Sequence, residues 1–173
     1  WGVDYGLLAD DGTLLDNPRN YRDPRTEGVM ERGLQLVPRE RIFASTGLQF
    51  LPFNTLWQLL SMREMSSPQL ASAQHLLLIP DLLHYFLTGE RVCEFTNATT
   101  TQFYDPRQGR WSTELFDAFD LPSRILPDIV EPGTRLGPIR SEIAAGCGLS
   151  RVPVVVPATH DTGSAVAAVP AQV

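Results

Sequence analysis

The sequence predicts an α/β domain in which strands and helices alternate along the chain. Helical spacing of apolar residues dominates the middle third. A β-branched run at residues 152–157 leads through a turn into an alanine-rich helix at 162–169, which makes a strand, a turn and a helix. Hydrophobic residues form 43% of the 173 residues, which is enough to bury a core. Functional side chains of such domains lie at the carboxyl ends of the strands.

The first 25 residues predict a hairpin followed by a loop. Residues 1–8 are typical of a strand, and residues 10–12, Asp-Asp-Gly, are typical of a turn into a second strand at 13–15. Residues 18–25 contain two prolines and three arginines, too many turn formers for regular structure. We therefore expect this segment to lie on a loop.

The middle of the chain predicts four helices. Apolar residues recur at helical spacing in residues 26–36, 38–45, 54–65 and 80–88. Asn54 or Thr55 suits an N-cap, and Gly47 and Gly89 are typical helix ends. The last helix follows a short apolar run at residues 75–79, which predicts a buried strand.

The remainder of the chain contains more turns. Hydroxyl and amide groups are concentrated at residues 94–103, where they could line a pocket or form a loop. Residues 122–148 carry four prolines and predict turns, with a short strand at 134–139 and a short helix at 141–148. The Gly-Cys-Gly at 146–148 runs into a strand, so it indicates a helix end and not a phosphate-binding loop.

Charge and composition argue against several classes of function. The net charge of −6 disfavours nucleic acid or an anionic membrane surface as a partner. All 14 basic residues are arginine, so this segment has neither a Schiff-base lysine nor the lysine of a Walker A motif. Its longest apolar runs are far shorter than the roughly 20 residues of a membrane span.

The start of the chain and its cysteines bear on its origin. The sequence begins at Trp1 without Met or a signal peptide, so we expect a piece of a longer protein. Cys93 and Cys147 are isolated in the sequence, which favours reduced thiols and a cytoplasmic location, although a disulfide between them stays open. The three histidines lack the spacing of a metal site.

Residues 158–164 form the most informative junction, because they join the end of a strand to the start of a helix. Amide groups and the dipole at a helix N-terminus stabilise negative charge there. A carboxylate at that point can accept a proton from a sugar hydroxyl as the hydroxyl attacks phosphorus. Asp161 is therefore a candidate general base, with His160 beside it. The alternative is that Asp161 or Thr162 only caps the helix.

The tetrapeptide Asp-Thr-Gly-Ser at 161–164 also matches the motif that carries the catalytic carboxylates of aspartic proteases. Those enzymes need two such motifs, or a dimer of one, and further strands after each. Here Ala-Val-Ala-Ala-Val follows, which favours a helix. The helical middle of the chain also disfavours an all-β protease.

Five stretches of the sequence are informative together. They are Trp1-Gly-Val-Asp-Tyr-Gly, Tyr21-Arg-Asp-Pro-Arg-Thr, Thr46-Gly-Leu-Gln-Phe-Leu-Pro-Phe-Asn-Thr-Leu, Thr96-Asn-Ala-Thr-Thr-Thr-Gln and His160-Asp-Thr-Gly-Ser-Ala-Val. In this combination they resemble the rhamnulokinases of the FGGY carbohydrate kinase family. They follow the order of the family and span almost the whole chain. The resemblance implies an actin-like, ribonuclease-H-like fold of two lobes, with residues 1–173 forming part of the N-terminal, sugar-binding lobe.

The resemblance also implies roles for particular residues. Asp161 matches the catalytic base of the family, and Gly2, His160 and Thr162 match positions that contact the ketose. Gly2 suits such a contact because its backbone can approach a sugar closely. Further candidates are polar groups at strand ends and in hydroxyl-rich loops, for which turn formation or solvation is an equal explanation: Asp4, Arg22, Asp23 and Asn97.

The implied reaction is ATP-dependent phosphorylation of L-rhamnulose, with Mg²⁺ accompanying the ATP. The glycine-rich phosphate loop of the family and its C-terminal nucleotide-binding lobe are not among the matched stretches, so we expect the chain to be inactive alone. Two alternatives stay open: a kinase of another sugar, such as fuculose or xylulose, and a non-catalytic sugar-binding module. The oligomeric state is not predicted.

Overall fold

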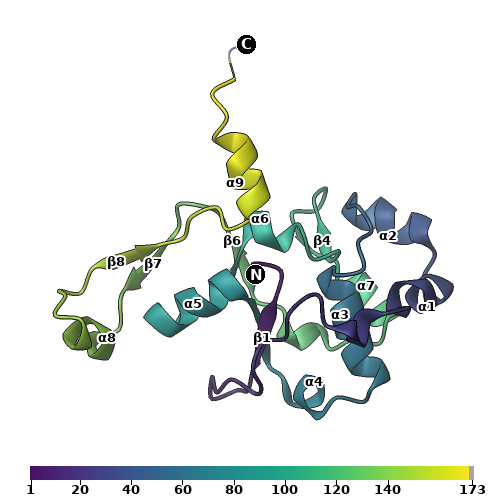
Figure 1. Ribbon diagram of the computed structural model, residues 1–173, viewed down its shortest axis with the longest axis horizontal. Coiled ribbons are helices and arrows are strands. Elements are labelled where there is room, and N and C mark those ends of the chain that lie inside the picture. The colour runs from purple at the N-terminus through teal and green to yellow at the C-terminus, as the bar shows by residue number, and fades with distance from the viewer. Residues whose placement is uncertain (172–173) are drawn as a thin grey trace.

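The computed structural model describes residues 1–171 (Figure 1). The fold is a mixed α/β arrangement with many helices, and the strands of the described residues pair in both parallel and antiparallel directions, within four two-stranded sheets. β1 (Tyr5–Leu8) runs antiparallel to β2 (His75–Leu78), and β3 (Val92–Glu94) runs parallel to β6 (Asp128–Val130). The other two pairs are antiparallel: β4 (Tyr104–Asp105) with β5 (Arg110–Trp111), and β7 (Arg135–Pro138) with β8 (Pro153–Val155).

Short helices surround these strands. In chain order they are η1 (Pro24–Thr26), α1 (Val29–Leu36), α2 (Arg39–Thr46), α3 (Thr55–Glu64), α4 (Pro68–Ser72), α5 (Ile79–Thr88), α6 (Phe95–Ala98), α7 (Thr113–Ala118), η2 (Ser123–Ile125), α8 (Ser141–Gly146) and α9 (Asp161–Ala167). No helix within residues 1–171 combines the length and the hydropathy that crossing a membrane requires.

The main core is built around α3. Leu56, Trp57 and Leu60 of this helix are fully buried, and the Trp57 ring meets the Phe119 ring edge to face with centroids 6.2 Å apart. Gly33 lets α1 pack closely on α3, because a Cβ atom there would lie 2.5 Å from Cζ3 of Trp57. This core packs α1 and Phe119 against α3.

The two faces of β1 enter different clusters because successive side chains of a strand point to opposite sides. Tyr5 and Leu7 join the main core. Leu8 joins a smaller cluster with Leu82 and Tyr85 of α5. β1 and β2 therefore join the main core to α5.

The N-terminal hairpin is shorter than the sequence predicts. Residues 1–4 form a turn, closed by a hydrogen bond from the Asp4 amide to the Trp1 carbonyl, so the strand begins only at Tyr5. The predicted second strand at 13–15 is reduced to one bridge between Leu8 and Leu14. Glycine also divides the predicted helix 26–36, because Gly28 has φ of +70° and separates η1 from α1.

The other long helices lie close to their predicted positions. α2, α3 and α5 match the predicted segments to within one residue at each end. Asn54 is the N-cap residue of α3, and Gly47 and Gly89 end α2 and α5 in the left-handed conformation. The polar segment 94–103 contains the four-residue helix α6 followed by turns.

The C-terminal part follows the predicted order of strand, helix, strand and helix. β7, α8, β8 and α9 all lie within two residues of their predicted positions. Figure 1 shows α9 extending away from the other elements, and none of its residues is buried. Cys93 is buried, Cys147 is exposed, and both are free thiols.

Candidate functional site

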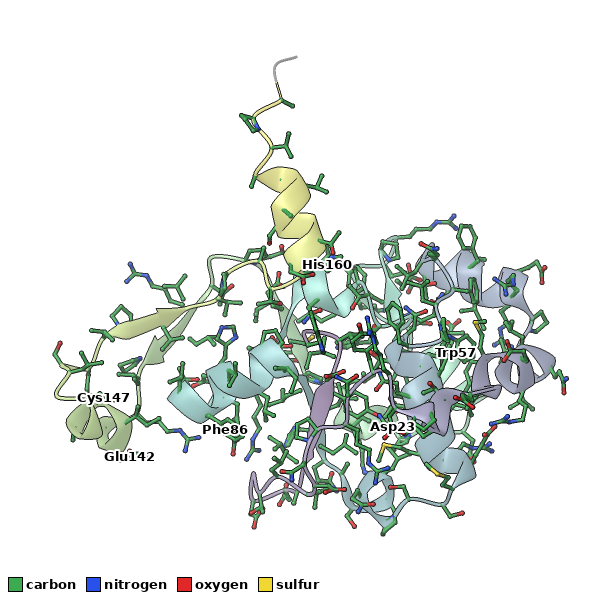
Figure 2. All side chains as sticks on the ribbon, in the orientation of Figure 1. Asp23, Trp57, Phe86, Glu142, Cys147 and His160 are labelled. Atoms are coloured by element: carbon green, nitrogen blue, oxygen red, sulfur yellow. The ribbon has the colours of Figure 1, made fainter. Side chains whose placement is uncertain are left out.

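The corner between β8 and α9, residues 156–161, lies against α6. Val156 is still paired, since its amide donates to the Thr134 carbonyl at 2.9 Å and its carbonyl accepts from the Gly133 amide at 2.7 Å. The chain then leaves the sheet, and His160 becomes the N-cap residue of α9. Figure 2 shows His160 at the base of α9, next to α6. The motif containing Asp161 therefore begins a helix, whereas an aspartic protease would need further strands there.

The buried carboxylate of Glu94 joins this corner to α6. Glu94 is the N-cap residue of α6 and accepts hydrogen bonds from the amides of Thr96 at 2.8 Å and Asn97 at 3.2 Å. The same carboxylate accepts from the Thr159 amide at 3.0 Å and from the Thr159 hydroxyl at 2.8 Å. The Thr96 hydroxyl in turn accepts from the His160 amide at 3.2 Å. Segments more than 60 positions apart therefore meet at one side chain.

Gly2 lies at the same place. Nδ2 of Asn97 donates to the Gly2 carbonyl at 3.1 Å. A Cβ atom on Gly2 would lie 3.6 Å from Nδ2 of Asn97 and 3.8 Å from the Thr159 carbonyl oxygen. The structure thus brings together Gly2, Asn97 and the corner that carries His160.

Asp161 presents its carboxylate to the outside of the corner. The side chain is exposed, and its Oδ1 accepts from the Thr162 amide at 2.6 Å and from the Thr162 hydroxyl at 3.2 Å. Its Oδ2 accepts no hydrogen bond from the described part of the chain. One carboxylate oxygen is held and the other has a lone pair available for an incoming proton.

The remaining candidates hold the loop at 18–25. Asp4 is buried, and its Oδ1 accepts from the Tyr21 amide at 2.7 Å. Arg22 is exposed, and its Nε donates to the Tyr21 hydroxyl at 2.9 Å. Asp23 accepts from the Arg25 amide at 2.9 Å and caps η1. The structure gives these three side chains local contacts within this part of the chain.

Residues 2–168 match the family model described as the FGGY family of carbohydrate kinases, N-terminal domain. The chain belongs to this family. The chain is 47% identical over 172 residues to a rhamnulokinase of Pectobacterium carotovorum and 40% identical over 172 residues to one of Oceanobacillus iheyensis. These matches cover 99% of the chain but only 34% and 36% of the relatives. The chain thus spans about a third of the length of the curated relatives it matches.

Solved structures of FGGY-type kinases share the fold. The xylulose kinase of Rhodospirillum rubrum superposes with a TM-score of 0.83 at 25% identity, over 98% of this chain and 35% of that one. A gluconate kinase of Lactobacillus acidophilus superposes with a TM-score of 0.81 at 22% identity, over 90% and 32%. The strands and helices described above are therefore those of an FGGY N-terminal lobe.

Sequence reasoning missed Glu94, Thr96 and Thr159. One signal was available, because Glu94 is the single charged residue between Val92 and Tyr104 in a run rich in hydroxyl and amide donors. A lone carboxylate among so many donors is what a buried, hydrogen-bonded acid requires. Its partner Thr159 carried no comparable signal.

Proposed function

We propose that the full-length protein phosphorylates L-rhamnulose on its terminal hydroxyl with ATP, giving L-rhamnulose 1-phosphate and ADP. Two findings support this proposal. The chain belongs to the FGGY carbohydrate kinases, and the relatives named rhamnulokinase match it over 99% of its length at 40% to 47% identity.

The arrangement of the corner supports Asp161 as the general base. Its Oδ1 accepts hydrogen bonds from Thr162, while Oδ2 accepts no hydrogen bond within the described chain, and the residue as a whole is exposed. In the proposed step the sugar O–H gives its proton to Oδ2 of Asp161. The oxygen forms a bond to the γ-phosphorus, and the bond from that phosphorus to the β–γ bridging oxygen breaks as ADP leaves.

We assign sugar contacts to Gly2, His160 and Thr162. The hydrogen bond from Asn97 fixes the Gly2 carbonyl, and the missing side chain of Gly2 leaves its backbone open to a polyol. His160 is half-buried at the base of α9, beside the proposed base. Orientation of the reacting hydroxyl by such contacts is a large part of catalysis in phosphoryl transfer.

ATP and its Mg²⁺ are assigned to parts of the protein outside this chain. We therefore propose that this chain supplies the sugar side of the cleft and the base, and that it is inactive by itself.

A coupled assay of the full-length protein with a panel of ketoses tests the proposal. We expect the highest kcat/KM with L-rhamnulose. A clear preference for fuculose or xylulose would assign the protein to another kinase of the same family. Binding of a sugar without consumption of ATP would instead indicate a non-catalytic sugar-binding module.

A further inference from the structure

Very few contacts hold the segment that begins at Pro157. Within the described chain, the hydrogen bonds from residues 157–171 to other residues are two from Thr159 to Glu94 and one from His160 to Thr96. No residue of α9 is buried. The position of Asp161 relative to Gly2 therefore depends on a small polar contact and not on hydrophobic packing.

All of these hydrogen bonds lead to Glu94. The Thr159 amide and hydroxyl donate directly to its Oε2, at 3.0 and 2.8 Å. The Thr96 hydroxyl that accepts from His160 also donates to Oε2 of Glu94. Glu94 thus holds both backbone amides that precede Asp161.

Glu94 is charged, buried and without a cationic partner. Its exposed fraction is 0%, and none of the ion pairs among the described residues includes it. Burial raises the pKa of its carboxyl, but hydrogen bonds from Thr96 and Thr159 together outweigh that effect, and the pKa lies below the usual value of a glutamate. A buried carboxylate is stable only when donors surround it, so α6 and the corner must converge on it.

The other end of Glu94 is also fixed. Its amide donates to Oδ1 of the buried Asp81 at 3.0 Å, which ties the end of β3 to α5. The link therefore runs from α5 through Asp81 and Glu94 to Thr159, two residues before the proposed base. A displacement of about 1 Å at a reacting group can reduce a rate by about 100-fold.

We propose that Glu94 is a positioning residue for phosphoryl transfer, which fixes the corner carrying His160 and Asp161 beside Gly2. This inference rests on the proposed function for its catalytic consequence. The positioning itself is a property of the fold and can be measured without turnover.

The variant Glu94→Gln tests the role with the smallest change of shape. Glutamine has one acceptor oxygen where the carboxylate has two, and its NH₂ group would face donors from Thr96 or Thr159. Asp105→Asn is the matched control, because Asp105 is also a buried carboxylate and accepts from the amides of Arg107 at 2.9 Å and Gln108 at 3.1 Å. Among the described residues, Asp105 makes no hydrogen bond to the corner.

Both variants are made in the full-length protein and compared in two measurements. Hydrogen exchange, read without sugar or ATP, should be about tenfold faster in Glu94→Gln in the peptide that contains Thr159 and His160, and unchanged in peptides of α3. The kcat for L-rhamnulose should fall by about 10- to 100-fold, with a smaller change in KM. Asp105→Asn should leave the exchange of that peptide unchanged.

Unchanged exchange of the corner in Glu94→Gln would overturn the proposal, as would a kcat within twofold of wild type. Exchange that rises equally in α3 would show general destabilisation and would also overturn it. If Glu94→Gln does not fold, Thr159→Val removes one of the same hydrogen bonds from the other side and is read in the same way. Full turnover by Asp161→Asn would refute the proposed base, while the exchange result would still decide the role of Glu94.

Discussion

The pH dependence of stability at Asp81 tests the hydrogen bonds that run from α5 through Asp81 and Glu94 to the corner. The Asp81 side chain is fully buried at the start of α5, with Oδ1 accepting from the Glu94 amide and Oδ2 without a geometrically satisfied hydrogen bond among the described residues. Burial raises the pKa of its carboxyl from 3.8 to about 7. Asp81→Asn keeps an oxygen acceptor for the Glu94 amide and removes the ionisable group, so we expect the variant to be more stable than wild type at alkaline pH.

The sign and size of this effect follow from linkage. Between pH 3.8 and 7 the folded state binds a proton that the unfolded state has already released, so stability falls as pH rises and levels off above pH 7. A shift of this size corresponds to about 4 kcal/mol at pH 8. By pH 5 part of that penalty has already appeared, so the advantage of Asp81→Asn over wild type should grow by about 2 to 3 kcal/mol from pH 5 to pH 8.

Urea unfolding of wild type and Asp81→Asn at pH 5 and pH 8 measures this difference. Asp105→Asn serves as a control of opposite sign. Burial raises the pKa of the Asp105 carboxyl, but hydrogen bonds from Gln108 and Arg107 lower it more, so its pKa lies below the usual value. That stabilisation is present at neutral pH and lost in acid, and the control variant should lose stability at pH 8. A difference between Asp81→Asn and wild type that does not change with pH would refute the reasoning.

Glycine positions give further predictions. Gly33→Ala places a methyl group 2.5 Å from the Trp57 ring, so overpacking should lower stability by about 1 to 3 kcal/mol in thermal unfolding. Gly146→Ala meets nothing within 4 Å in α8 and should raise stability by about 0.5 to 1 kcal/mol; equal effects of the two would contradict the packing of α1 on α3. Gly2→Ala makes only ordinary contacts, so the melting temperature should stay within about 2 °C while KM for the sugar rises by about tenfold. An unchanged KM would remove Gly2 from the sugar site.

The helices were predictable where their signals are local. Apolar spacing predicts the positions of α2 and α5, and the glycines at 47 and 89 predict where they end. The structure shows both helices ending there, with each glycine in the left-handed conformation. α4 and α7 have five and six residues, too few for a period to appear. β3 and β6 have three residues each, and Val92 pairs with Asp128, which lies 36 positions later in the sequence. Tertiary contacts and not local sequence therefore set their pairing.

The candidate site was predictable only in part for the same reason. Gly2, His160 and Asp161 lie in contiguous motifs that a reader can recognise one at a time. Glu94 gains its role from Thr159, 65 positions later, and no local pattern reports that meeting. Burial of a charge without a counter-ion is visible only once both segments are placed.

The most direct test of the proposed function is the phosphoryl-transfer rate of full-length Asp161→Asn with L-rhamnulose and saturating ATP. Asparagine can keep the hydrogen bonds from Thr162 to Oδ1 but cannot accept the sugar proton at Oδ2. We predict a rate lower by about 100-fold or more, with sugar affinity close to wild type and with Asp117→Asn, an exposed aspartate of α7, fully active. A rate for Asp161→Asn equal to that of wild type would contradict the assignment of the base.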